Sequence, residues 1–163
     1  MIGINERARP VDFLGEEPLF LGHYTGEIKQ NNRLTLPTGF HGLIADGVYV
    51  AQGFDRNLLV LTKSTFEGLY QHVTSLNIAD PLARLFLRMF LGSATFMQVG
   101  TDGMLSIPDG LVRFANLTNQ VVLVGQGDYF ELWSTDQWED QKAQLNDFQA
   151  NAQRFSAFSI TTR

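Results

Sequence analysis

The chain has 163 residues and a net charge of −5, from 12 basic and 17 acidic side chains, with an isoelectric point of about 5.1. Hydrophobic residues make up 44% of it, which supplies a folded core and excludes global disorder. The absence of cysteine excludes disulfides, thiolate catalysis and cysteine-bound zinc. Two arginines interrupt the most apolar stretch, residues 82–94, so we expect a packing helix, no membrane partner and a cytoplasmic protein.

The first half of the chain predicts a strand, a turn, a strand, a short helical stretch, a hairpin and a helix. In order, these elements are placed at residues 24–28, 30–32, 34–36, 39–44 and 47–61 and from 64 onward. The turn contains two asparagines, which tolerate left-handed backbone, and Pro37 ends the preceding strand because proline cannot donate to a ladder. Ser64, with Glu67 three residues later, predicts an N-cap with a capping box.

A helix is predicted next, from Asp80 to Leu91, with Pro81 in its first turn. Arg84 and Arg88 lie four residues apart on one face. Another face is apolar and is expected to pack; its members are Leu82, Leu85, Phe86, Met89 and Phe90.

The same series of elements then recurs about 71 residues later in the chain. Met104–Pro108 repeats the pattern of Arg33–Pro37, after a turn at 100–103 that contains Asp-Gly. Strands at 120–124 and 130–133 and a helix capped by Asp136 complete the second copy. A unit of roughly fifty residues cannot bury a good core alone. We therefore expect the strands of the two halves to interleave around one shared core.

This organisation divides the chain into five segments. They are a flexible N-terminal extension at 1–18, a first repeat at 19–74, a connecting helix at 75–93, a second repeat at 94–146 and a C-terminal tail at 147–163. The tail contains Phe148, Phe155 and Phe158, and the sequence leaves open whether they dock on the rest of the chain.

No residue pattern in the sequence indicates catalytic chemistry. His23, His41 and His72 lie far apart and lack the spacing of a metal site. The Gly-rich stretch at 125–127 precedes a strand, so no helix N-terminus is available there for a phosphate. We predict no enzyme, no catalytic residue, no metal or cofactor and no small-molecule substrate.

The first predicted turn has the residue types that bind nucleic acid. Its tip, residues 29–33, consists of Lys29, Gln30, Asn31, Asn32 and Arg33. Arginine can bond guanine through two hydrogen bonds, asparagine and glutamine suit adenine, lysine suits phosphate, and a two-stranded ribbon fits the major groove. On composition alone, an ordinary solvated turn explains the same residues. Residues 1–94 contain eight basic and nine acidic side chains, whereas residues 95–163 contain four basic and eight acidic ones. The first half is therefore less negative, and we expect it to face an anion.

Several segments together resemble the MraZ family of bacterial transcriptional regulators, over about residues 20–145. These segments are Phe20–Tyr24, Arg33–Pro37, Asp80–Arg84, Val121–Gln126 and Phe130–Trp133 with Trp138. The resemblance implies an α+β fold that is mostly β. It is a double-split β-barrel of two tandem AbrB-like (βαβ-hairpin) repeats, with connecting and C-terminal helices.

The resemblance also implies a function. Members form ring-shaped homo-oligomers associated with the nucleoid. They bind double-stranded promoter DNA at short G-rich repeats upstream of the division and cell-wall gene cluster, including their own promoter.

The DNA-contacting motif of this family, Asp-x-x-x-Arg, commonly ending in Gly-Arg, occurs once per half, and both copies depart from it here. The first keeps Arg33 but has Lys29 in place of the aspartate and Asn32 in place of the glycine. The second, Gly100–Met104, keeps the glycine but has lost both the aspartate and the arginine. We therefore expect DNA to be read by the first hairpin only. The alternative is an oligomeric scaffold that has lost specific DNA binding, which the broken motifs and the acidic balance favour.

Overall fold

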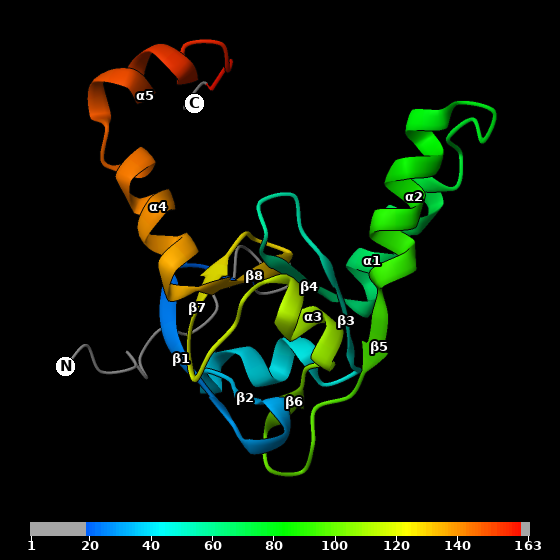
Figure 1. Cartoon of the computed structure of the whole chain (residues 1–163), viewed down its shortest axis with the longest axis vertical. Helices are drawn as coiled ribbons and strands as arrows, with labels where there is room; N and C mark the ends of the chain where they lie inside the picture. Colours follow the sequence, from blue (N-terminus) through cyan, green and yellow to red (C-terminus); the bar gives the residue numbers. More distant parts are fainter. Residues whose placement is uncertain (1–18, 161–163) are drawn as a thin grey trace.

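A computed structural model describes residues 19–160, and the predicted extension at 1–18 lies outside the described residues. Its strands form one sheet in the order β5-β3-β4-β8-β7-β1-β2-β6 (Figure 1). The strands are β1 (His23–Lys29), β2 (Arg33–Thr35), β3 (Val48–Gln52), β4 (Leu58–Thr62), β5 (Thr95–Met97), β6 (Met104–Ser106), β7 (Gln120–Gly125) and β8 (Tyr129–Ser134). The helices are η1 (Gln30–Asn32), η2 (Thr38–Ile44), α1 (Lys63–Val73), α2 (Pro81–Ser93), α3 (Asp109–Phe114), α4 (Thr135–Leu145) and α5 (Phe148–Phe155).

The two halves exchange strands, as the repeat predicts. Strand β1 pairs with β7, and β3 pairs with β5, while β2 lies against β6 and β4 against β8. All of these pairs are antiparallel, and the sheet forms a nearly closed barrel (Figure 1). The predicted mostly-β α+β fold is confirmed.

The barrel stays open between β5 and β6, the two ends of the sheet. The Asp-Gly dipeptide of the turn at 100–103 predicts a hairpin here. Only the turn forms, with the Gly100 N–H donating to the Met104 carbonyl at 2.9 Å, while β5 pairs with β3 and β6 pairs with β2.

Side chains that point into the barrel form the main core. Three phenylalanines meet at its centre, with ring centroids 4.9 Å apart for Phe20–Phe40 and 5.2 Å for Phe20–Phe130. Leu34 on β2 and Leu105 on β6 lie opposite each other and are fully buried. One core therefore serves both halves.

Helices α1 and α4 cover equivalent places outside the barrel, and each begins two residues earlier than predicted. The side-chain oxygen of Thr62 accepts from the Thr65 N–H at 3.2 Å, and that of Ser134 from the Gln137 N–H at 3.2 Å. The expected caps, Ser64 and Asp136, lie inside the first turns. The reason is that Thr62 and Ser134 are each both the last residue of a strand and the cap of the next helix, so each helix follows its strand directly.

The connecting helix α2 begins as predicted, with Asp80 accepting from the Leu82 N–H at 2.9 Å and Pro81 in the first turn. Only part of its predicted packed face is buried. Phe90 is buried in the cluster with Ala51, but Leu82 is 72% exposed and Leu85 62%. No helix within residues 19–160 is long and apolar enough to span a membrane.

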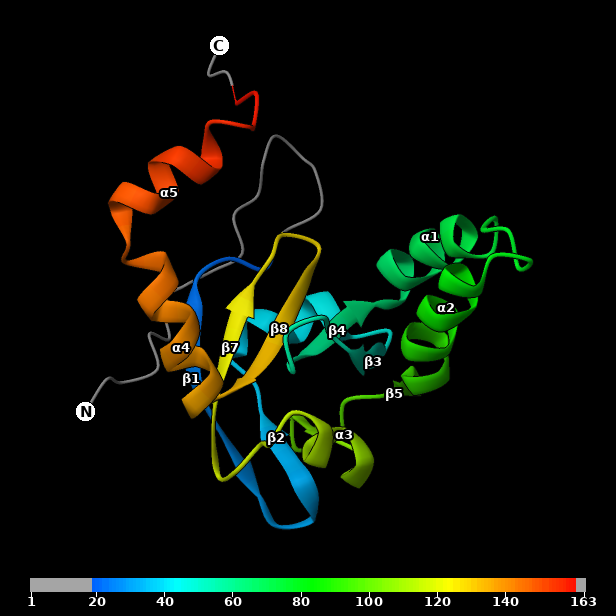
Figure 2. The ribbon, with the colours of Figure 1, turned by 45° about the horizontal axis from the view of Figure 1, so that its top comes forward.

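The helices form two arms that diverge from the barrel. Arm α1–α2 and arm α4–α5 rise on opposite sides, whereas the β1–β2 hairpin lies at the other end of the molecule (Figures 1 and 2). The hairpin tip is therefore clear of both arms.

Candidate nucleic-acid interface

The β1–β2 hairpin closes on a three-residue turn in which two asparagines adopt left-handed backbone. Asn31 has a φ of 62° and Asn32 a φ of 55°, as the turn prediction requires. Lys29 and Arg33 lie directly opposite each other where the two strands enter the turn. Like charges at such a position repel each other.

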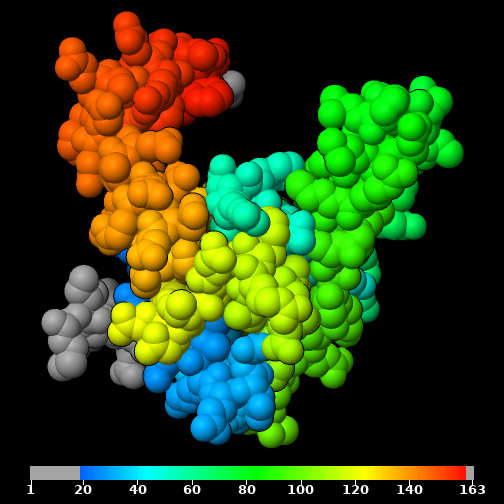
Figure 3. Space-filling view, in the orientation of Figure 1, coloured from blue at the N-terminus to red at the C-terminus, as the bar shows by residue number. Residues whose placement is uncertain are grey.

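Three of the five candidate side chains point into solvent. Lys29, Gln30 and Asn31 are exposed at the tip. Within residues 19–160 no carboxylate lies within ion-pair distance of Lys29. The space-filling view shows the hairpin as a protrusion at one end of the molecule, beside the segment that contains α3 (Figure 3). These side chains are accessible to a large ligand.

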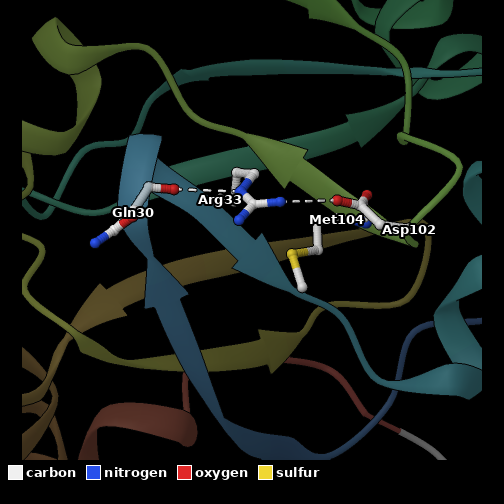
Figure 4. Close-up of polar contacts among 4 residues, drawn as sticks. All are labelled: Gln30, Arg33, Asp102 and Met104. Carbon is white, nitrogen blue, oxygen red and sulfur yellow. Dashed lines mark hydrogen bonds and ion pairs between the residues drawn. The ribbon is translucent and has the colours of Figure 1, made fainter.

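Arg33 is held in place by two acceptors and stays half-exposed. Its Nε donates to the Gln30 carbonyl at 3.3 Å, and its Nη1 lies 3.2 Å from Asp102 Oδ2 in the second half of the chain (Figure 4). The side chain is 41% exposed despite this ion pair. Arg33 therefore remains at the surface rather than folding into the barrel.

The fifth candidate, Asn32, contacts the other half of the chain. Its side-chain amide donates to the Asp109 carboxylate, and its carbonyl accepts from the Ile107 N–H at 2.9 Å. On the opposite flank the Ile28 N–H donates to the Asn119 carbonyl at 2.8 Å. The second half therefore fixes the hairpin on both sides, and Asn32 contributes to this anchoring.

Two carboxylates that the sequence pattern does not single out, Asp102 and Asp109, lie beside the tip. Asp102 reads as an ordinary turn residue, and its partner Arg33 lies 69 positions away. Only the register of β2 against β6, with Thr35 opposite Met104, brings them together. The two negative charges of these carboxylates therefore offset the two positive charges of the tip.

The second motif copy, Gly100–Met104, has no cation of its own, and Met104 stands where the motif has its arginine. Met104 lies on the same outer side of the β2–β6 pair as Arg33, since the intervening Leu34 and Leu105 point inward. The thioether of Met104 has no donor hydrogen and is only a weak acceptor, so its side chain cannot donate a hydrogen bond to a base.

Glu131 forms a separate polar cluster within the barrel wall, on β8. Glu131 accepts from Asn57 Nδ2 at 2.8 Å and from Trp133 Nε1 at 2.6 Å. Burial raises the pKa of this carboxyl, and the two hydrogen bonds oppose that rise. Between residues 19 and 160 no three potential metal ligands cluster together. The stretch at Gly125–Gly127 connects β7 to β8, as predicted.

Comparison with known proteins identifies relatives along most of the chain. Residues 89–158 match the family model described as "MraZ protein, putative antitoxin-like". A protein of Herpetosiphon aurantiacus named "Transcriptional regulator MraZ" is 31% identical over 143 residues, which is 87% of this chain and 100% of that protein. Proteins with the same name from Roseiflexus castenholzii and Mycolicibacterium smegmatis are 34% and 31% identical, covering 85% and 88% of this chain and 94% and 96% of their own lengths.

The similarity extends over the full length of one of these relatives and nearly that of the other two. The chain belongs to the MraZ family.

Proposed function

We propose that this protein is a DNA-binding transcriptional regulator that reads duplex DNA with the tip of its first hairpin, Lys29–Arg33. The observation that carries this proposal is the protruding tip, with three exposed polar side chains and an arginine held half-exposed beside them. The names of the relatives agree with it, since they are called transcriptional regulators. The proposed target is the promoter of the division and cell-wall gene cluster and its own promoter, in the cytoplasm at the nucleoid.

Each tip residue has a distinct part in this proposal. Arg33 bonds a guanine edge in the major groove, where arginine makes its most common specific contact. Lys29 contacts phosphate, and Gln30 and Asn31 approach the neighbouring bases or backbone. A two-stranded ribbon is narrow enough to bring all of them into the groove.

The proposal includes assembly into a closed ring of identical subunits, which would place many tips on one DNA. Both arms have exposed apolar side chains, with Leu82 and Leu85 on α2, and Phe148 and Phe155 on α5. Two different surfaces of one chain that dock head to tail close into a ring when the rotation allows it. Each added tip then raises the overall affinity through effective concentration.

The charges of the two arms support the same contact. Helix α2 contains Arg84 and Arg88 and no carboxylate, whereas α4 contains three carboxylates against one lysine. The acidic residues of α4 are Asp136, Glu139 and Asp140. We propose that the α4–α5 arm of one subunit packs on the α1–α2 arm of the next. In this proposal residues 19–74 and 94–146 are the two repeats of the barrel, residues 75–93 connect them, and residues 147–163 form the tail that completes the contact.

The test compares Arg33→Ala with Met104→Ala in binding titrations at one salt concentration. The probes are a duplex from upstream of the protein's own gene and a shuffled duplex of equal length. We expect Arg33→Ala to abolish the preference for the promoter duplex and Met104→Ala to leave it unchanged. Equal losses in both variants would contradict reading by the first hairpin.

A scaffold without specific DNA binding is the second candidate. The carboxylates of Asp102 and Asp109 beside the tip and the acidic balance of the chain favour it. Salt dependence separates the two candidates, because a DNA-binding protein loses affinity steeply with salt in proportion to the phosphates it neutralises. A scaffold would bind promoter fragments without such a slope, or not at all.

A further inference from the structure

The ion pair between Arg33 and Asp102 joins the two halves of the chain at the hairpin tip. We propose that Asp102 is a positioning residue for DNA reading: the second loop, which has no arginine of its own, orients the arginine of the first. This inference rests on the proposed function, since Asp102 acts through Arg33 and not on the DNA.

Asp102 is itself fixed before it meets the arginine. Its Oδ1 accepts from the Met104 N–H at 3.0 Å, which leaves Oδ2 for Arg33. The turn around it is closed by the Gly103 N–H donating to the Gly100 carbonyl at 2.9 Å, and Gly103 adopts a φ of 77° that a side chain would strain. The carboxylate is therefore held rigidly against the hairpin.

The arrangement holds the guanidinium without using the groups that read DNA. A guanidinium has five N–H donors. Nε is used by the Gln30 carbonyl and one Nη1 donor by Asp102, which leaves the second Nη1 donor and both Nη2 donors of Arg33 (Figure 4). Two donors are sufficient for the O6 and N7 atoms of guanine. Because the side chain is already ordered, less conformational freedom is lost when it binds.

Asp102 also counteracts the repulsion at the tip. Lys29 lies opposite Arg33 across the hairpin, and a like charge at that position pushes the guanidinium away from a fixed orientation. The carboxylate on the other side of Arg33 attracts it back toward β6. Without Asp102, we expect Arg33 to sample several rotamers.

Asp109, the first residue of α3, provides a matched control. It carries the same charge, belongs to the same half and contacts the same tip, but through Asn32 rather than Arg33. Asp102→Asn and Asp109→Asn each remove one negative charge and keep a side-chain oxygen that accepts hydrogen bonds. The Arg33–Asp102 ion pair and the Asn32–Asp109 hydrogen bond both lie at the surface and contribute little to stability, so both variants are expected to fold.

The experiment measures the ratio of dissociation constants for two duplexes at fixed salt. The probes are a 20-base-pair duplex that the wild-type protein selects from a random library, and a shuffled version of it. Loss of negative charge should tighten binding of Asp109→Asn to both duplexes alike and leave the ratio unchanged. Asp102→Asn should also bind the shuffled duplex more tightly but lose about tenfold in the ratio, as expected for a weakened bidentate base contact. Equal ratios in the two variants would overturn the positioning role.

A second measurement needs no DNA. In ¹⁵N NMR spectra of the side chain, rotation of the Arg33 guanidinium should be hindered in the wild-type protein and in Asp109→Asn, and fast in Asp102→Asn. Free rotation in a wild-type protein that discriminates between the duplexes would overturn the inference alone. If the wild-type library selection yields no preferred duplex, the proposed function fails and the inference falls with it.

Discussion

The two loops at Lys29–Arg33 and Gly100–Met104 occupy equivalent places in the repeat yet have opposite chemistry. The first is the end of a paired ribbon with exposed polar side chains; the second is a tight turn whose strand β5 pairs elsewhere. The residues that directly follow the two loops are alike, since Leu34 and Leu105 both point into the same core. The comparison shows that a duplicated barrel can diverge on its surface while its interior stays constrained.

The largest expected effect tests the shared interior. Leu34→Ala and Leu105→Ala should each lower the free energy of unfolding by about 2–5 kcal/mol, because each opens a cavity in a fully buried site. Urea unfolding of both variants should show a single transition. Two separate transitions, or a loss confined to one variant, would break the claim that the halves form one cooperative unit.

The next effect separates charge from geometry in the first loop. Arg33→Lys keeps the positive charge but loses the planar fork, so specific binding should weaken by about 1–3 kcal/mol. Binding to a shuffled duplex should change little. Titrations of both duplexes at one salt concentration provide the measurement, with Met104→Leu as the control in the second loop. An unchanged preference in Arg33→Lys would show that Arg33 contacts phosphate only.

A smaller effect is expected at Lys29, which faces solvent without an ion-pair partner among residues 19–160. Lys29→Gln should weaken binding to all sequences alike and reduce the salt slope by about one unit for each tip in contact. Affinities measured between 50 and 200 mM salt would test this. A change in sequence preference would instead assign Lys29 to base reading.

The smallest effect concerns Leu59 and Glu131, which occupy equivalent positions in the two repeats but differ in chemistry. They lie opposite each other on β4 and β8. Burial raises the pKa of Glu131 above its ordinary value of 4.5 in the folded protein. Its contribution to stability is therefore greatest below that value and is lost as the pH rises through the raised pKa. Glu131→Gln should remove this dependence and leave stability at neutral pH equal or slightly higher. Melting temperatures of both proteins between pH 4 and 8 would show whether the difference follows this direction.

The architecture was predictable because the repeat gives each strand twice and a half-repeat cannot bury a core alone. The left-handed asparagines at the tip were predictable for a local reason, since turn chemistry depends on neighbours in sequence. The contact of Arg33 with Asp102 was not, because it depends on the register of two three-residue strands from different halves. The exposure of Leu82 was missed for a similar reason: periodicity identifies an apolar face but not how far the barrel extends beneath it.

The pairing of β2 with β6 has a consequence for how specificity can change. A slip of one residue would turn Leu34 outward and Arg33 into the core, so the buried leucines indirectly fix where the arginine stands. The neighbouring residues that face outward on β2 and β6 do not determine the register. New recognition preferences can therefore arise by exchanging surface residues on these two short strands, while the hydrophobic side continues to set the alignment.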